Sequence, residues 1–244
     1  MLEGLYMAAT GMEAQQEQLN ALANDMANMS TPGYQATRVG FHDLLYTTGG
    51  KATGSTVATG AGAAAQIIGR SQLQGSIQRT DQPLDVAIVG EGYIQVRRPD
   101  GSIGLTRNGV LQTDAQGHLT TNVGMLLEPP ITLPKGVRPD QVTIGPDGTV
   151  ATGTHKLGKI SLVTVPAPDQ LLADGDGVFS ATAASGAIRP ATGVTLQQGA
   201  VEASNVDVAD TMVGMIDAQT GYSMSSKAVN FEDQMLSIAN QIKR

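Results

Sequence analysis

Hydrophobic positions divide the chain into two ends with one rhythm and a middle with another. Near the start they recur every seven residues, at Leu5, Met12, Leu19 and Met26. Near the end the same spacing returns, at Val208, Met215, Tyr222, Val229 and Leu236. Because a seven-residue repeat lines up along one side of a helix, this spacing is typical of helices that pack along a shared seam. The pattern predicts two long terminal helices that form a coiled-coil-like pair.

The distribution of proline and glycine supports the same division. All 11 prolines lie between Pro32 and Pro190. Residues 1–29 and 205–244 contain only four glycines, Gly4, Gly11, Gly214 and Gly221. Proline costs about 3 kcal/mol inside a helix, so Pro32 ends the first helix, and Asp207 is a good N-cap for the second. We therefore expect a terminal helical domain formed by residues 1–30 and 205–244, with helices roughly 40 and 50 Å long.

The middle of the chain consists of short apolar runs separated by turn sequences. Val86–Val89, Ile103–Thr106 and Val142–Ile144 are of strand length, and Pro99-Asp100-Gly101 and Pro146-Asp147-Gly148 are typical turns. No helical pattern of 10 to 15 residues separates the runs, which disfavours a parallel α/β sheet. The predicted class is α+β, with an all-β middle domain at residues 83–204.

Residues 31–82 are expected to link the first helix to this domain. The stretch from Gly49 to Gly69 consists mostly of Gly, Ala, Thr and Ser, which offer little to bury. Such a composition favours an extended or mobile arm that only neighbouring elements can order.

Charge and composition narrow the classes of partner. The chain carries 15 Lys and Arg against 22 Asp and Glu, a net charge of −7, which disfavours nucleic acid. It has no apolar run long enough to span a bilayer, and its first 37 residues lack the basic side chains of membrane-surface helices, so no membrane insertion is expected. Cysteine is absent, which excludes disulfides and thiolate chemistry. With nucleic acid and membranes disfavoured, other proteins are the expected class of partner.

Catalytic and ligand-binding motifs are missing or incomplete. His42, His118 and His155 are far apart and form no metal-binding pair. The glycines at residues 60–65 do not follow a buried strand, as a dinucleotide loop requires. Asp174-Gly175-Asp176-Gly177 lacks the further ligands of a calcium loop and is predicted to be a turn. We expect no enzyme and no catalytic, cofactor-binding or metal-binding residue.

The apolar seams of the terminal helices are better explained by contacts between chains than by a hydrophobic core within one chain. Two narrow helices bury too little to offset the cost of ordering their backbones, so they are expected to be marginal alone. Nine of the ten methionines lie in the end segments, and methionine adapts to irregular partners. The predicted subunit-interface residues are the nine heptad positions, Leu5, Met12, Leu19, Met26, Val208, Met215, Tyr222, Val229 and Leu236.

Two segments that include parts of the predicted helices, and two segments in the middle of the chain, resemble a known family. Residues 22–34 resemble the N-terminal signature of bacterial flagellar rod and hook proteins, and residues 201–236 are similar to the closing helix of that family. Residues 85–93 and 105–109 resemble its β domain. The signature positions are Asn24, Asn28, Thr31, Pro32, Gly33 and Tyr34. Asn24 and Asn28 either satisfy backbone groups or bridge chains, or they are ordinary polar residues at a helix end.

The resemblance implies a structural subunit of the flagellar basal-body rod. In such a helical homo-oligomer the terminal helices would line the inner wall, the β domain would face outward and the arm would tie neighbours together. The implied partners are other rod proteins, the hook and the surrounding ring proteins. The resemblance also implies type III export and a torque-transmitting hollow shaft. The chain length, the block Ser204-Asn205-Val206 and the modest β insert together most resemble the distal part of the rod, with the proximal part next.

Two other classes of function stay open from sequence alone. One is a secreted binding module whose β domain holds a ligand and whose helices only dimerise. The other is an enzyme in which scattered aspartates hold a metal.

Overall fold

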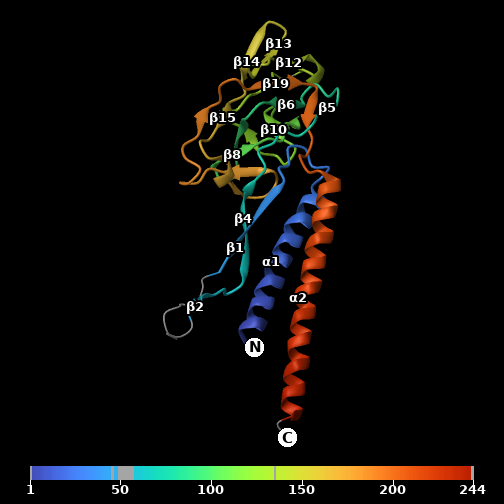
Figure 1. The fold of residues 1–244 in the computed structure, drawn as a ribbon. Coiled ribbons are helices and arrows are strands. Elements are labelled where there is room, and N and C mark those ends of the chain that lie inside the picture. The colour runs from blue at the N-terminus through green and yellow to red at the C-terminus, as the bar shows by residue number, and fades with distance from the viewer. Residues whose placement is uncertain (1, 45–46, 49–57, 135, 243–244) are drawn as a thin grey trace. The chain divides into compact units, whose positions relative to one another are not determined.

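The computed structural model describes residues 2–44, 47–48, 58–134 and 136–242, which form two compact units (Figure 1). Unit 1 comprises Met1–Ala27, Thr37–Ile68 and Asp207–Arg244. Unit 2 comprises Asn28–Ala36 and Gly69–Val206. Residues 49–57 of the stretch at residues 49–69 that the sequence assigns to an arm lie outside the described residues, and residues 58–69 include β3 and most of β4.

Unit 1 contains both helices of more than one turn in the described chain. Helix α1 spans Leu2–Ala27 and helix α2 spans Val208–Ile242. Asp207 caps α2, because its Oδ1 accepts hydrogen bonds from the backbone N–H groups of Ala209 at 2.8 Å and Asp210 at 3.1 Å. The sequence prediction of two long terminal helices is confirmed, and so is the capping role of Asp207.

The rest of unit 1 is a narrow β ribbon. Strands β1 (Thr37–Asp43) and β4 (Ala63–Arg70) pair with each other, as do β2 (Thr47–Thr48) and β3 (Ala58–Thr59). A side chain at Gly40 would lie 2.7 Å from Ile68 Cγ2, so glycine allows the two strands to pack closely. The buried carboxylate of Asp25 accepts two hydrogen bonds from Thr37 N, which fixes the start of β1 to α1.

Unit 2 is built from short strands, and the described strands of this unit all pair antiparallel. Its largest sheet has the order β16-β17-β8-β7-β11-β10-β9, with β15 joining β7 to β18. Smaller sheets pair β12 with β13 and β14, β6 with β19, and β5 with β20. The bounds are β5 Ile77–Arg79, β6 Val86–Val89, β7 Tyr93–Arg97, β8 Ile103–Thr106, β9 Leu111–Thr113, β10 Leu119–Thr121, β11 Leu126–Leu127, β12 Val142–Ile144, β13 Thr149–Thr152, β14 His155–Lys159, β15 Leu162–Thr164, β16 Leu172–Ala173, β17 Val178–Ser180, β18 Arg189–Pro190, β19 Thr195–Gln198 and β20 Ala200–Glu202.

The middle of the chain is therefore mostly β, as the sequence predicts. Three predicted strands, β6, β8 and β12, have the bounds expected from their apolar runs. Apart from two single turns of 3-10 helix at Pro139–Gln141 and Pro168–Gln170, the described part of unit 2 contains no helix.

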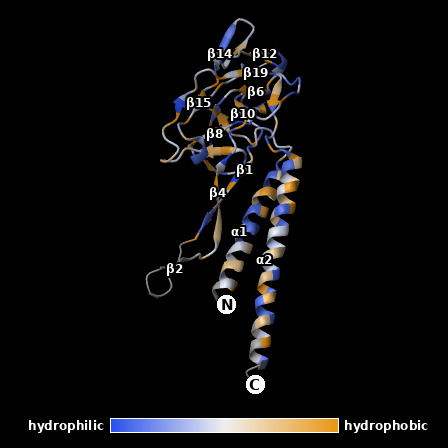
Figure 2. Cartoon of the chain, in the orientation of Figure 1, coloured by the Kyte–Doolittle hydropathy of each residue, from blue (hydrophilic) through white to orange (hydrophobic). Residues whose placement is uncertain are grey.

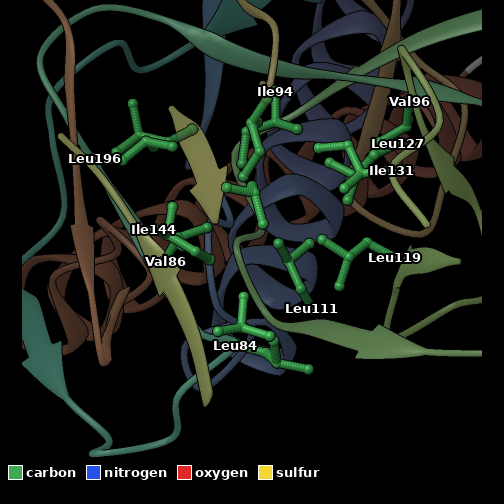
Figure 3. Close-up of a cluster of buried hydrophobic side chains, with 14 of the residues drawn as sticks. Leu84, Val86, Ile94, Val96, Leu111, Leu119, Leu127, Ile131, Ile144 and Leu196 are labelled. Carbon is green, nitrogen blue, oxygen red and sulfur yellow. The ribbon is translucent and has the colours of Figure 1, made fainter. Parts of the chain in front are cut away.

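A buried apolar cluster holds unit 2 together. Figure 3 shows side chains from several strands meeting in it, including Val86, Ile94 and Leu119, which are all fully buried. A smaller cluster surrounds Tyr93 and Phe179, whose rings meet edge to face at 5.9 Å. Unit 2 thus has a hydrophobic core of its own.

Candidate subunit interface

Small side chains line the contact between α1 and α2. A methyl group added at Gly214 would lie 3.3 Å from Leu22 Cδ1, and one added at Gly221 would lie 3.0 Å from Gln15 Cδ. A methyl group added at Gly11 would lie 3.5 Å from Ser225 Oγ, and one added at Gly4 would meet the carboxylate of Glu232. Because each step along α1 is matched by an equal step backwards along α2, the helices run antiparallel in one continuous register (Figure 1).

The most buried residues of the helices are small as well. Ala14, Ala21 and Ala218 are 7% exposed or less, and the other apolar residues that are buried, among those whose burial is described, lie in unit 2. A contact of glycine and alanine lets two backbones approach closely. It also leaves many large apolar side chains of both helices partly uncovered, although Leu22 lies against Gly214.

Helix α2 carries most of these uncovered side chains. Figure 2 shows that hydrophobic positions recur along this helix. Five of them lie within about a quarter of its circumference, at 3.6 residues per turn. We call them the outer stripe, and they are 56 to 64% exposed: Val213, Ile216, Met224, Phe231 and Ile238. The stripe lies roughly 110° around the helix from the glycines that face α1. An apolar row of this length on a surface helix is typical of an interface with another protein.

The two helices also differ in length. Helix α1 has 26 residues and α2 has 35. Since Gly4 lies opposite Glu232, the last two turns of α2 extend past the start of α1. This end of α2 includes Met235 and Ile238, both 56% exposed, and has no partner within the described part of unit 1.

The heptad positions predicted from sequence lie beside the helix contact. Val208 and Tyr222 are each 39% exposed, and the other positions whose burial is described are half-buried: Leu5, Met12, Leu19, Met26, Met215 and Val229. Leu236 lies in α2, but its side chain is outside the described residues. The heptad analysis did not single out the outer stripe, whose residues follow steps of three, eight, seven and seven along α2 in a different register from the Val208 series. It also missed the contact made by Gly4, Gly11, Gly214 and Gly221, although these glycines themselves are spaced by seven.

Residues 28–34 of the family-like signature form a tight joint within unit 2, together with Gln35 and Ala36. Gly33 adopts a left-handed backbone conformation with φ of 69°, and a methyl group there would lie 2.6 Å from the backbone carbon of Arg107. Its N–H donates to the carbonyl of Glu202 at 2.8 Å. Only glycine fits this position, because both the conformation and the close approach exclude a side chain.

Side chains extend this joint to the returning chain. Asn205 Oδ1 accepts from Ala36 N at 2.7 Å, and Asn205 Nδ2 donates to the carbonyls of Ser71 and Leu73. Thr31 Oγ1 donates to Asn28 Oδ1 at 3.2 Å. Among the signature residues, Gly33 and Tyr34 therefore hold the segment after α1 against the segment before α2, because the carbonyl of Tyr34 accepts from Asn205 N at 3.2 Å. Thr31 bonds to Asn28 within the first of these segments, Asn24 is exposed on α1 and Pro32 is half-buried.

A buried ion pair lies beneath the joint. Arg107 and Glu202 are 2 and 3% exposed, and Glu202 Oε2 accepts from Arg107 Nε at 3.0 Å and from Nη2 at 2.9 Å. Glu202 Oε1 accepts from Gly75 N at 3.0 Å, and Arg107 also donates to the carbonyls of Gly90 and Gly92. Because every charged atom has a partner, the pair is tolerated in the interior. The sequence analysis does not predict that Arg107 and Glu202 pair.

Tyr93 makes this region sensitive to alkali. Burial raises the pKa of Tyr93 above its ordinary 10.0, although Arg107 lowers it. The folded state therefore holds the phenol proton more tightly than the unfolded state. Stability from this group is fully present below pH about 10 and is lost as the pH rises further. We expect the free energy of unfolding to fall as the pH rises above about 10 in the native protein, and less in Tyr93→Phe.

Chemical denaturation at these pH values would measure this difference. Tyr222→Phe is the matched control, because Tyr222 is exposed on α2. An equal fall in Tyr93→Phe and in the native protein would contradict the assignment.

No group of three or more His, Asp or Glu side chains that could hold a metal ion occurs among the described residues. Asp174-Gly175-Asp176-Gly177 forms the turn between β16 and β17, and Asp174 pairs with Arg98 at 2.6 Å. None of the helices, within their described residues, is both long and apolar enough to cross a membrane.

Three protein-family models match the chain. The model described as "Flagella basal body rod protein" matches residues 5–35, and "Flagellar hook protein FlgE/F/G D1 domain" matches residues 87–152. The model described as "Flagellar basal body rod FlgEFG protein C-terminal" matches residues 197–242. The first and third cover the helices and the joint.

Comparison with individual proteins extends the similarity over the full length of the chain. The flagellar basal-body rod protein FlgG of Borreliella burgdorferi is 36% identical over 264 residues, which cover 100% of both chains. The FlgG of Buchnera aphidicola from Acyrthosiphon pisum is 36% identical over 99% of this chain and 100% of its own. The flagellar basal-body rod protein FlgF of Salmonella typhimurium is 30% identical over 96% of each chain.

Proposed function

Because this chain belongs to the flagellar basal-body rod protein family, we propose that it polymerises through its terminal helices into a hollow, torque-transmitting shaft. It is a structural subunit of the flagellar basal-body rod. Identity of 36% to FlgG proteins, against 30% to an FlgF protein, favours the distal rod over the proximal rod. Its relatives are structural proteins, and we propose that it likewise catalyses no reaction.

The outer stripe on α2 carries the proposal. A single chain pairs its helices through small residues and leaves five large apolar side chains more than half exposed. Burying such side chains stabilises an assembly by about 1.5 to 3 kcal/mol each. An interface between different surfaces of identical chains forms a ring where its rotation closes and an open helix of subunits where it does not, and we propose the open helix here.

The heptad positions fit the same assembly. We propose that Leu5, Met12, Leu19 and Met26 on α1, with Val208, Met215, Tyr222, Val229 and Leu236 on α2, flank the intrachain contact and complete coiled-coil-like seams with neighbouring chains. The segments before and after unit 2 then act as the connection between the polymerising part and the β domain. Other rod proteins and the hook are the partners that the family implies. The surrounding rings and export through the type III channel remain part of the proposal.

Electron microscopy of the purified full chain at increasing concentration tests this function. We expect tubes that form above a critical concentration and sediment. A discrete dimer at every concentration would instead support a binding module that dimerises through its helices. A fully ordered monomer would contradict both.

A further inference from the structure

We propose that a cavity in unit 2 binds a carboxylate group from a neighbouring copy of this chain. The cavity measures about 420 Å³, and its walls include the segment at residues 28–35 and the turn between β16 and β17. Neither the seams of the helices nor the ion pair of Arg107 uses it. The volume suits a side chain with its adjoining backbone, not a folded domain.

Arg70 provides the charge in this cavity. Its guanidinium carbon lies 5.2 Å from the ring centre of Tyr34 and 5.8 Å from that of Phe179, so two aromatic rings hold it in place. Its Nη1 donates to the carbonyl of Gln35 at 2.8 Å. No ion-pair partner of Arg70 occurs among the residues that the structure describes. Since a guanidinium has five N–H donors, several stay available for a ligand.

The other polar groups of the cavity favour a carboxylate over a more highly charged anion. Asn108 and Asn122 lie in the wall and bond to each other at 3.1 Å, and such amides can also pair with peptide groups. Arginine binds carboxylates through two parallel hydrogen bonds. Asp176 also lies in the wall, and its negative charge repels anions, most strongly those with two charges, such as phosphate.

A second copy of this chain is the occupant that the observations favour, and this step rests on the proposed function. The chain has 22 acidic residues against 15 basic ones, so every copy presents surplus carboxylates to its neighbours. The cavity wall includes Asn28 and Thr31, which directly follow helix α1. The site is therefore continuous in sequence with the proposed polymerising helices.

The critical concentration for tube formation by the full chain tests this proposal. Arg70→Gln should raise it by about tenfold or more, because losing a charged hydrogen-bonding partner costs about 1.5 to 3 kcal/mol. Arg70→Lys keeps the positive charge but loses the planar guanidinium group. Its critical concentration should lie between those of the native chain and Arg70→Gln. Arg79→Gln is the matched control, since the Arg79 side chain is 79% exposed and pairs only with exposed Asp81, and it should change nothing.

Asp176→Asn separates binding from folding. Asp176 has a φ of 53°, which asparagine also tolerates, so the turn is kept while a repulsive charge is removed. We expect the critical concentration to fall, which no folding defect would produce. An unchanged or raised value for Asp176→Asn, or an unchanged value for Arg70→Gln, would overturn the proposal while native tubes still form. If the native chain forms no tubes, the proposed function itself fails.

A cross-linking experiment identifies the occupant directly. Val123 lines the cavity and is 43% exposed, so Val123→p-benzoylphenylalanine places a photoreactive ring at its mouth. In tubes grown from mixed light and heavy isotope-labelled copies, we expect cross-links between copies to peptides containing Asp or Glu. Cross-links confined to one copy, or to segments without acidic residues, would overturn the inference.

Discussion

The double variant Ile216→Asp/Phe231→Asp is expected to remain monomeric at concentrations where the native chain forms tubes. Both residues belong to the outer stripe and are 62 and 64% exposed, so neither substitution disturbs a core within the chain. Their burial in an assembly would contribute about 3 to 6 kcal/mol together, which corresponds to roughly 10² to 10⁴ in critical concentration. Sedimentation and electron microscopy measure the effect.

The control for this variant adds the same charges elsewhere on the same helix. Gln219→Asp/Asn230→Asp changes two exposed polar residues of α2 outside the stripe. Its critical concentration should stay within about twofold of the native value, since substitutions at solvated surface positions usually cost less than 0.5 kcal/mol. Equal loss of assembly in both double variants would mean that net charge, not the stripe, controls polymerisation.

The second large effect is expected in unit 2, where Glu202→Ala should lower the free energy of unfolding by about 3 to 5 kcal/mol. The substitution leaves the buried guanidinium of Arg107 without its carboxylate and removes the acceptor for Gly75 N. Glu202→Gln keeps an acceptor oxygen and should lose less. Chemical denaturation followed by the near-ultraviolet circular dichroism of tyrosine measures both, because the chain has five tyrosines and no tryptophan.

Arg79→Ala provides the comparison for a solvated pair. The Arg79 and Asp81 side chains are 79 and 77% exposed, so their salt bridge should contribute about 1 kcal/mol or less. If Glu202→Ala cost no more than Arg79→Ala, the buried pair could not be what stabilises the joint.

Local sequence patterns predicted those elements whose signals are local. The apolar runs of β6, β8 and β12 are bounded by turns or glycines, so their bounds could be read directly. Strand β5, with the sequence Ile-Gln-Arg, is fully exposed and shows no such pattern. It exists because Ile77 and its neighbours pair with β20, more than one hundred residues away. Distant pairings of this kind leave no trace in a short window.

The candidate interface divides in the same way. Sequence spacing predicted that both ends are helical and that Asp207 caps the second, because these features depend on neighbouring residues. It did not show which side of each helix faces the other. That choice depends on close contact at glycines such as Gly214, whose lack of a side chain carries no hydrophobic signal. Arg107 and Glu202 are 95 residues apart, so their pairing was equally invisible.

The tie between the outgoing and returning chain has a mechanical consequence for a rotating part. Load that the helices carry reaches unit 2 directly along two covalent strands, one entering at residue 28 and one leaving at residue 206, which are two of the four places where the chain passes between the units. Backbone hydrogen bonds from Gly33 N to Glu202 O and from Asn205 N to Tyr34 O fasten these strands to each other. Tension on either strand is therefore shared by both, and fatigue at this point requires two anchorages to yield together.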